Sequence, residues 1–226
     1  MTDDRHMAAM SHWRDRAQQN PYGICPLVVI TKGWPYDSDY RRGANEDMHV
    51  LQDWLYHQTG KTWRTVPAIR INSLQTAEEH AAGNIYFDIA GQFSDFCNPK
   101  RLYVLYSTGY TGLANMAGRS AFGCTPDPSN PYEPWGPGRA GGPSAWAMEL
   151  VAGHSVELEP GQTQNAYRGA TLHESLHCLG VQHPDSAVYG NAAWLSPMAG
   201  WWFFGTPECA LLPYEIAYLR GSHFFR

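Results

Sequence analysis

The sequence contains little charge, and its basic residues form no run. Asp, Glu, Lys and Arg together make up 16% of the 226 residues, and the formal net charge at pH 7 is -5. Proteins that act on nucleic acid usually carry a clustered basic face, so we expect no nucleic-acid partner. Apolar runs are also short. None approaches the roughly 20 residues that a membrane-spanning helix needs, and we expect no membrane association.

Cysteine is scarce, and no C-x-x-C pair occurs. With five cysteines, at least one has no disulfide partner within the chain. Bridges such as Cys97–Cys124 or Cys25–Cys209 are compatible with the sequence, which does not choose between them.

Apolar and aromatic residues are abundant by contrast. They supply 43% of the chain as hydrophobic residues, with 9 Trp and 13 Tyr. This composition supports a substantial core, and the length fits one domain or one domain of two lobes around a cleft. The aromatic residues either line a groove for peptides or sugars or fill the core.

One motif organises the chain: His-Glu-Ser-Leu-His-Cys-Leu-Gly-Val-Gln-His-Pro, starting at residue 173. His173 and His177 are four residues apart, so on a helix both project from one face and can hold one small cation. Gly180 can adopt the left-handed conformation that ends a helix and turns the chain. That turn can return His183 as a third ligand. Three protein ligands leave one tetrahedral position open, which is typical of a catalytic zinc site.

Two acidic residues offer another third ligand. Glu208 or Glu215 could complete the site in place of His183, as in the gluzincin arrangement, but the spacing of Gly180 and His183 favours the histidine. Glu174 is placed to hold a water on the cation and not to bind the cation itself.

The motif resembles the zinc signature of the metzincin clan of metallopeptidases, H-E-x-x-H-x-x-G-x-x-H followed by a Met-turn. Met198, in Trp-Leu-Ser-Pro-Met-Ala-Gly, matches the Met-turn. Pro184 after the third histidine resembles the serralysin branch. However, position 200 is Gly where serralysins and astacins carry a Tyr, and no calcium-binding Gly-Asp repeats follow. The resemblance therefore extends to the clan and to no single family within it.

The resemblance implies zinc at His173, His177 and His183, Glu174 as general base, and Met198 as an apolar floor below the metal. It also implies a metzincin-like α+β fold. We expect a mixed twisted sheet with an antiparallel edge strand and two helices, then the active-site helix, and a mostly irregular C-terminal part with a terminal helix. Residues 1–226 would form one catalytic domain, with an upper subdomain at 1–180 and a lower one at 181–226.

Hydrophobic periodicity places the elements along the chain. We expect strands near residues 25–31, 66–71, 101–106 and 145–152, and helices near 45–56, 73–82 and 213–220. Residues 122–144 contain six prolines and are expected to form a long loop. Asp127 and Glu133 in that loop are weak candidates for a calcium site. In the clan, an edge strand binds extended substrate by main-chain hydrogen bonds. We assign that role to Leu113, Ala114, Asn115 and Met116.

The expected function is that of a zinc-dependent endopeptidase acting as a monomer on protein or peptide substrates. The alternative is a non-catalytic or latent metal-binding module for protein interaction; latency would need Cys25 or an N-terminal Asp to block the metal. Clan resemblance favours secretion. The start of the chain lacks a hydrophobic signal core, so a cytoplasmic location also stays open.

Overall fold

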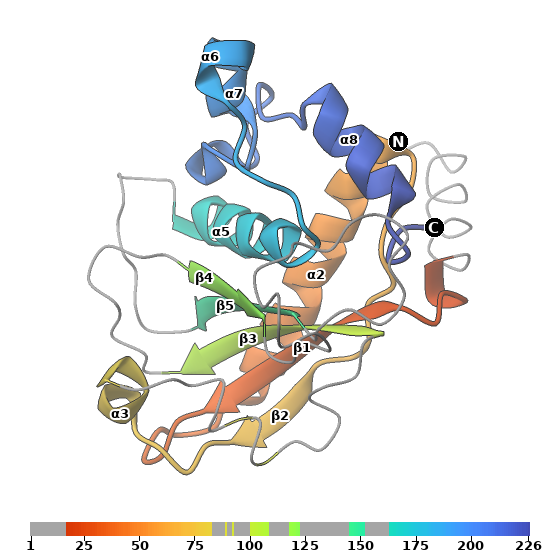
Figure 1. Cartoon of the computed structure of the whole chain (residues 1–226). Helices are drawn as coiled ribbons and strands as arrows, with labels where there is room; N and C mark the ends of the chain where they lie inside the picture. Colours follow the sequence, from red (N-terminus) through yellow and green to blue (C-terminus); the bar gives the residue numbers. More distant parts are fainter. Residues whose placement is uncertain are drawn as a thin grey trace, which may run out of the picture.

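A five-stranded sheet forms the base of the molecule (Figure 1). The structure, a computed structural model, describes residues 17–82, 89, 92, 100–108, 118–122, 145–151 and 163–226. The strand order is β2-β1-β3-β5-β4, and within this sheet only β4 runs antiparallel to its neighbour. The sheet is therefore mixed, and its antiparallel edge strand lies at residues 118–122, whereas the residues 113–116 expected to form that edge lie outside the described residues. The strands are β1 (Gly23–Ile30), β2 (Ile69–Asn72), β3 (Arg101–Thr108), β4 (Gly118–Phe122) and β5 (Ala145–Val151).

Strand β1 is buried along its whole length because β2 and β3 flank it and helix α2 (Ser38–Thr59) packs on it. The prediction for β2 was wrong at its start. Residues 66–68 do not belong to the strand, because Pro67 has no N–H to donate. The preceding segment still reaches β1, since the amide of Val66 donates to the carbonyl of Ile24 at 2.8 Å.

Helix α2 (Ser38–Thr59) begins earlier than the predicted residue 45. Asp37 caps it by accepting a hydrogen bond from the amide of Asp39 at 2.9 Å. Gly60 ends the helix with a φ of 70°. Helix α3 (Ala77–Ala82) is shorter than predicted because Thr76, and not Ser73, caps it; the Thr76 hydroxyl accepts from the amide of Glu79 at 3.2 Å.

Helices α2 and α5 (Thr163–Cys178) cover the same face of the sheet (Figure 1). Helix α2 contacts β1, helix α5 contacts β3, β4 and β5, and the two helices touch each other. Leu172, Leu176 and Leu179 are buried between α5 and the rest of the core, as the sequence predicts. An ion pair fixes the helices together: Arg168 Nε lies 2.7 Å from Asp47 Oδ1.

The C-terminal part lies on the side of α5 opposite the sheet (Figure 1). It is mostly irregular and ends in a helix, as expected. Its short elements are α6 (Ser186–Tyr189), α7 (Asn191–Leu195), the 3-10 turn η1 (Trp201–Phe203) and α8 (Pro213–Gly221). Among the described helices, none combines the length and the apolar character that a bilayer crossing demands.

Several predictions fall outside the described residues. These are the substrate-binding residues Leu113, Ala114, Asn115 and Met116, the calcium candidates Asp127 and Glu133, and the Cys97–Cys124 bridge. Cys25 and Cys209 are both buried and are not joined by a disulfide, so that suggested bridge was wrong.

Candidate metal centre

Helix α5 presents His173 and His177 one turn apart, and its C-terminal cap turns the chain toward His183. The amide of Val181 donates to the carbonyl of Leu176 at 2.9 Å, and that of Gly180 donates to the carbonyl of His177 at 2.8 Å. This pair of bonds is a Schellman motif, which needs a left-handed residue. Gly180 supplies it with a φ of 94°. The role predicted for this glycine is confirmed.

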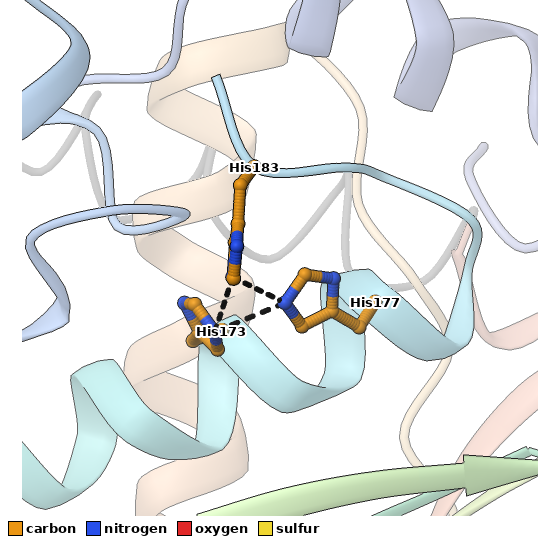
Figure 2. Close-up of side chains that lie close together, drawn as sticks. All are labelled: His173, His177 and His183. Atoms are coloured by element: carbon orange, nitrogen blue, oxygen red, sulfur yellow. Dashed lines mark hydrogen bonds between the residues drawn. The ribbon is translucent and has the colours of Figure 1, made fainter. Parts of the chain in front are cut away.

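The cap brings the three histidines together (Figure 2). The Nε2 atom of His177 lies 3.0 Å from that of His173 and 2.8 Å from that of His183. The third separation, between His183 and His173, is 3.2 Å. Nitrogens that share one tetrahedral zinc at about 2.0–2.1 Å lie about 3.3 Å apart. The three Nε2 atoms therefore need to move only slightly apart to bind such an ion together.

Two backbone carbonyls decide where the ring protons lie. The Nδ1 atom of His173 is 2.9 Å from the carbonyl oxygen of Pro197, and Nδ1 of His177 is 2.9 Å from that of Val181. A carbonyl only accepts, so in each neutral ring Nδ1 carries the proton and Nε2 carries a lone pair. The two Nε2 lone pairs then face each other at 3.0 Å without a hydrogen between them. A shared cation makes this arrangement favourable.

Burial keeps the two helix histidines neutral. It is the largest cause that lowers the pKa of His173, and it lowers the pKa of His177 to about 4, with the neighbouring rings adding to the effect. Neutral imidazole is the form that binds a metal. His183 is exposed, which leaves the third corner of the cluster open to solvent.

The turn at residues 196–200 borders the site. The amides of Ala199 and Gly200 both donate to the carbonyl of Ser196, at 3.0 and 2.8 Å. Met198 is fully buried in this turn, and the carbonyl of Pro197 faces His173. The segment identified as a Met-turn candidate therefore contacts a candidate ligand through its backbone.

Gly200 has a steric reason to lack a side chain. A Cβ at this position would overlap the carbonyl oxygen of Trp194 and lie 2.8 Å from the ring of Phe203. A tyrosine, as carried by serralysins and astacins at this point of the motif, would not fit this turn.

The acidic alternatives for a third ligand do not reach the cluster. Glu215 is fully buried and binds Ser196 and the amide of Leu212, while Glu208 is exposed; neither belongs to the histidine group. Cys25 lies buried in β1, where it pairs with Tyr103 of β3, which gives no support to a thiol that blocks the metal.

Glu174 lies on α5 directly after His173 and is partly buried. Its assignment as general base stays a prediction. The groups that orient two of the rings, the backbone carbonyls of Val181 and Pro197, were not predicted. Every residue type carries a carbonyl, so the sequence holds no signal for them.

No protein-family model matches the sequence, and no curated protein matches it significantly. Solved structures do resemble the fold. Wild-type OgpA from Akkermansia muciniphila matches with a TM-score of 0.58 at 16% identity. Catalytically inactive OgpA in complex with an O-glycopeptide substrate, glycodrosocin, matches with a TM-score of 0.61 at 14% identity. Each match covers 91% of this chain and 62% of the OgpA chain. At these identities the likeness concerns the fold, and it is consistent with the metzincin-like architecture expected from the motif.

Proposed function

We propose that the chain is a zinc-dependent endopeptidase of the metzincin clan, with His173, His177 and His183 as metal ligands and Glu174 as general base. The observation that carries the proposal is the convergence of three Nε2 atoms, two of which have lone pairs fixed toward each other by carbonyls on Nδ1. Imidazole ligands in this number suit zinc and leave an open position for water.

A bound zinc ion would supply two effects: it lowers the pKa of its water ligand to about 7, and it polarises a peptide carbonyl. The chain's own residues do the rest. The Glu174 carboxylate takes a proton from the attacking water as the new C–O bond forms. It then gives that proton to the amine nitrogen as the C–N bond breaks, so that the carboxylate is regenerated. The Nδ1 bonds of His173 and His177 keep both rings oriented during these steps.

The proposed substrates are proteins or peptides. Because OgpA has been captured with an O-glycopeptide, O-glycosylated peptides are the first class to test beside unmodified ones. We further propose that an extended substrate lies along Leu113, Ala114, Asn115 and Met116.

The decisive experiment compares the unaltered chain with Glu174→Gln. We expect casein or quenched peptides, glycosylated and plain, to be cleaved by the unaltered chain only; chelator should stop the reaction and added zinc restore it. Glu174→Gln should bind zinc normally and lose at least about 100-fold in kcat/KM, because an amide cannot take the proton from the attacking water. Undiminished cleavage by this variant would remove Glu174 from the mechanism. Zinc binding without cleavage by the unaltered chain would favour the non-catalytic module.

Further parts of the proposal follow from clan resemblance. Met198 would form the apolar floor of the metal site. A cleft would separate residues 1–180 from residues 181–226. The enzyme would act as a secreted monomer.

A further inference from the structure

The first turn of α8 contacts two segments beside the candidate metal centre: the turn that contains Ser196 and the segment that contains Gln182. Residue Glu215 of α8 is fully buried. The Ser196 hydroxyl donates to Glu215, with contacts of 2.8 and 2.9 Å to its two carboxyl oxygens, and the amide of Leu212 donates to Oε2 at 2.7 Å. A buried acidic group with such partners is anchored in one orientation.

The link from Glu215 continues to a ligand. A serine hydroxyl has one proton, and here it goes to the Glu215 carboxyl group, so the oxygen is left to accept from the amide of Met198 at 3.1 Å. The Met198 amide and the Pro197 carbonyl belong to the same peptide group of the dipeptide Pro197–Met198, so Ser196 fixes the orientation of that group. The carbonyl of Pro197 lies within that dipeptide and is the group that orients Nδ1 of His173 at 2.9 Å.

Tyr214 makes a second link from the same helical turn. Its hydroxyl lies 3.0 Å from the carbonyl of Gln182 and 3.3 Å from Oε1 of Glu215. The hydroxyl has a single proton to donate, and the shorter contact is with Gln182, the residue directly before His183. The ring of Tyr214 also stacks on Tyr189, with ring centroids 5.3 Å apart, so the hydroxyl is held in place.

We propose that Glu215 and Tyr214 are positioning residues of the metal centre. Through Ser196 and Tyr214 respectively, α8 sets the ring of His173 and the backbone that carries His183. The remaining histidine, His177, takes its orientation from the cap of its own helix, through the carbonyl of Val181. This inference rests on the proposed function only in that it requires a metal at the three histidines.

The proposal predicts a loss of metal affinity beyond any loss of stability. Outer-shell groups that orient metal ligands typically contribute about 10- to 100-fold to affinity. If the contacts of α8 served stability alone, their removal would lower the melting temperature and leave the zinc affinity of the folded chain unchanged.

The test uses Ser196→Ala and Tyr214→Phe, each of which removes one hydroxyl. The dissociation constant for Zn2+ is measured by competition with a chromophoric chelator, and the melting temperature of the metal-free chain is measured alongside. We expect Ser196→Ala to weaken zinc binding about 10- to 100-fold and Tyr214→Phe about 3- to 10-fold, since the group that Ser196 fixes contacts the ring of His173, whereas Tyr214 bonds only the carbonyl before His183.

Thr59→Val is the matched control. The Thr59 hydroxyl is also buried; it lies 2.6 Å from the carbonyl of Lys61 and 2.9 Å from that of Leu55, and it accepts from the amide of Lys61 at 3.1 Å. Its loss should lower the melting temperature and leave the Zn2+ dissociation constant within about twofold, because these hydrogen bonds stay within the last turn of α2 and the two residues that follow it.

Glu215→Gln tests the hydrogen bond between Ser196 and Glu215 by changing its acceptor. The Glu215 carboxyl oxygens accept from Ser196 and Leu212, and an amide offers only one acceptor oxygen. If this variant does not fold, Ser196→Ala still breaks the connection to Pro197. Zinc affinity of Ser196→Ala and Tyr214→Phe equal to that of the unaltered chain would overturn the inference and leave the proposed function standing. No zinc binding by the unaltered chain would overturn both.

Discussion

At the scale of single residues, the protonation of His173 and His177 decides whether their Nε2 atoms can bind a metal ion. The carbonyls of Pro197 and Val181 hold the Nδ1 protons of His173 and His177, so protonation can occur only at the nitrogens that face the metal position. A proton and a metal ion therefore compete for the same lone pairs. Burial favours the neutral ring in both cases.

This competition predicts how the stability of the metal-free chain depends on pH. Burial lowers the pKa of His177 from 6.5 to about 4 in the folded chain. Between these values the unfolded chain binds more protons than the folded chain, so the free energy of unfolding decreases as the pH falls. From this residue alone we expect a loss of about 2 kcal/mol between pH 7.5 and pH 5.

Urea unfolding of the metal-free chain at several pH values measures this effect. His177→Gln carries no titrating ring and should flatten the pH dependence by about that amount. An equally steep dependence in the variant would mean that another group causes it.

At the scale of elements, helix α5 packs on the sheet with one face and on η1 with another. Leu172 and Leu176 of this helix are buried in the core, while the backbone of η1 lies against Gly169 at very close range. A Cβ on Gly169 would overlap the carbonyl oxygen of Trp201 and lie 2.8 Å from the Cβ of Phe204. The close approach of these two elements therefore requires glycine at this position.

Gly169→Ala and Gly43→Ala should change stability in opposite directions. Alanine at 169 forces η1 away from α5, and we expect a loss of at least about 2 kcal/mol. Alanine at 43, within α2, meets nothing within 4 Å. It should raise the free energy of unfolding by up to about 1 kcal/mol, because alanine favours helix over glycine. Chemical denaturation measures both. A neutral Gly169→Ala would contradict the packing described here.

Sequence patterns predicted elements whose signals are local. The apolar run of β1 and the leucine spacing of α5 depend only on neighbouring residues, and both are where they were expected. The start of α2 was missed because its first turns are mostly exposed and polar, with Arg42 paired to Asp39, and only Tyr40 and Ala44 face the core there. The start of β2 was missed because the apolar alternation continues across Pro67, which cannot donate a hydrogen bond to a neighbouring strand.

In the candidate site, too, the residues whose positions are fixed locally were predicted, and those that meet only in the folded chain were not. Motif spacing predicted the three histidines, since the helix and its glycine cap fix their separation locally. Ser196 and Glu215 are 19 residues apart and meet only through the tertiary fold. The sequence therefore suggested Glu215 only as a ligand, whereas in the structure it accepts hydrogen bonds from Ser196 and Leu212.

At the scale of the whole molecule, the histidines join two parts of the chain. His173 and His177 belong to α5, which packs on the sheet, while His183 lies beyond the end of α5, in the segment before α6 (Figure 2). A metal bound by all three would cross-link these parts in the folded state only. Ligands that bind the folded state alone stabilise it according to their concentration.

Zinc should therefore raise the melting temperature. At a free concentration 100 times its dissociation constant, zinc would add about 2.7 kcal/mol, or about 5–10 °C for a chain of this size. Differential scanning fluorimetry with and without chelator measures the shift. His183→Ala should lose most of it, and a full shift in that variant would show that the metal does not use this residue.

The central claim is that three imidazoles bind one metal ion. Metal analysis of the purified chain after equilibrium dialysis against zinc tests it most directly, with His183→Ala and Glu174→Gln beside it. We expect one zinc per chain for the unaltered protein and for Glu174→Gln, and at least about 100-fold weaker binding for His183→Ala. Zinc-free unaltered chain, or His183→Ala that binds zinc as tightly as the unaltered chain, would contradict it.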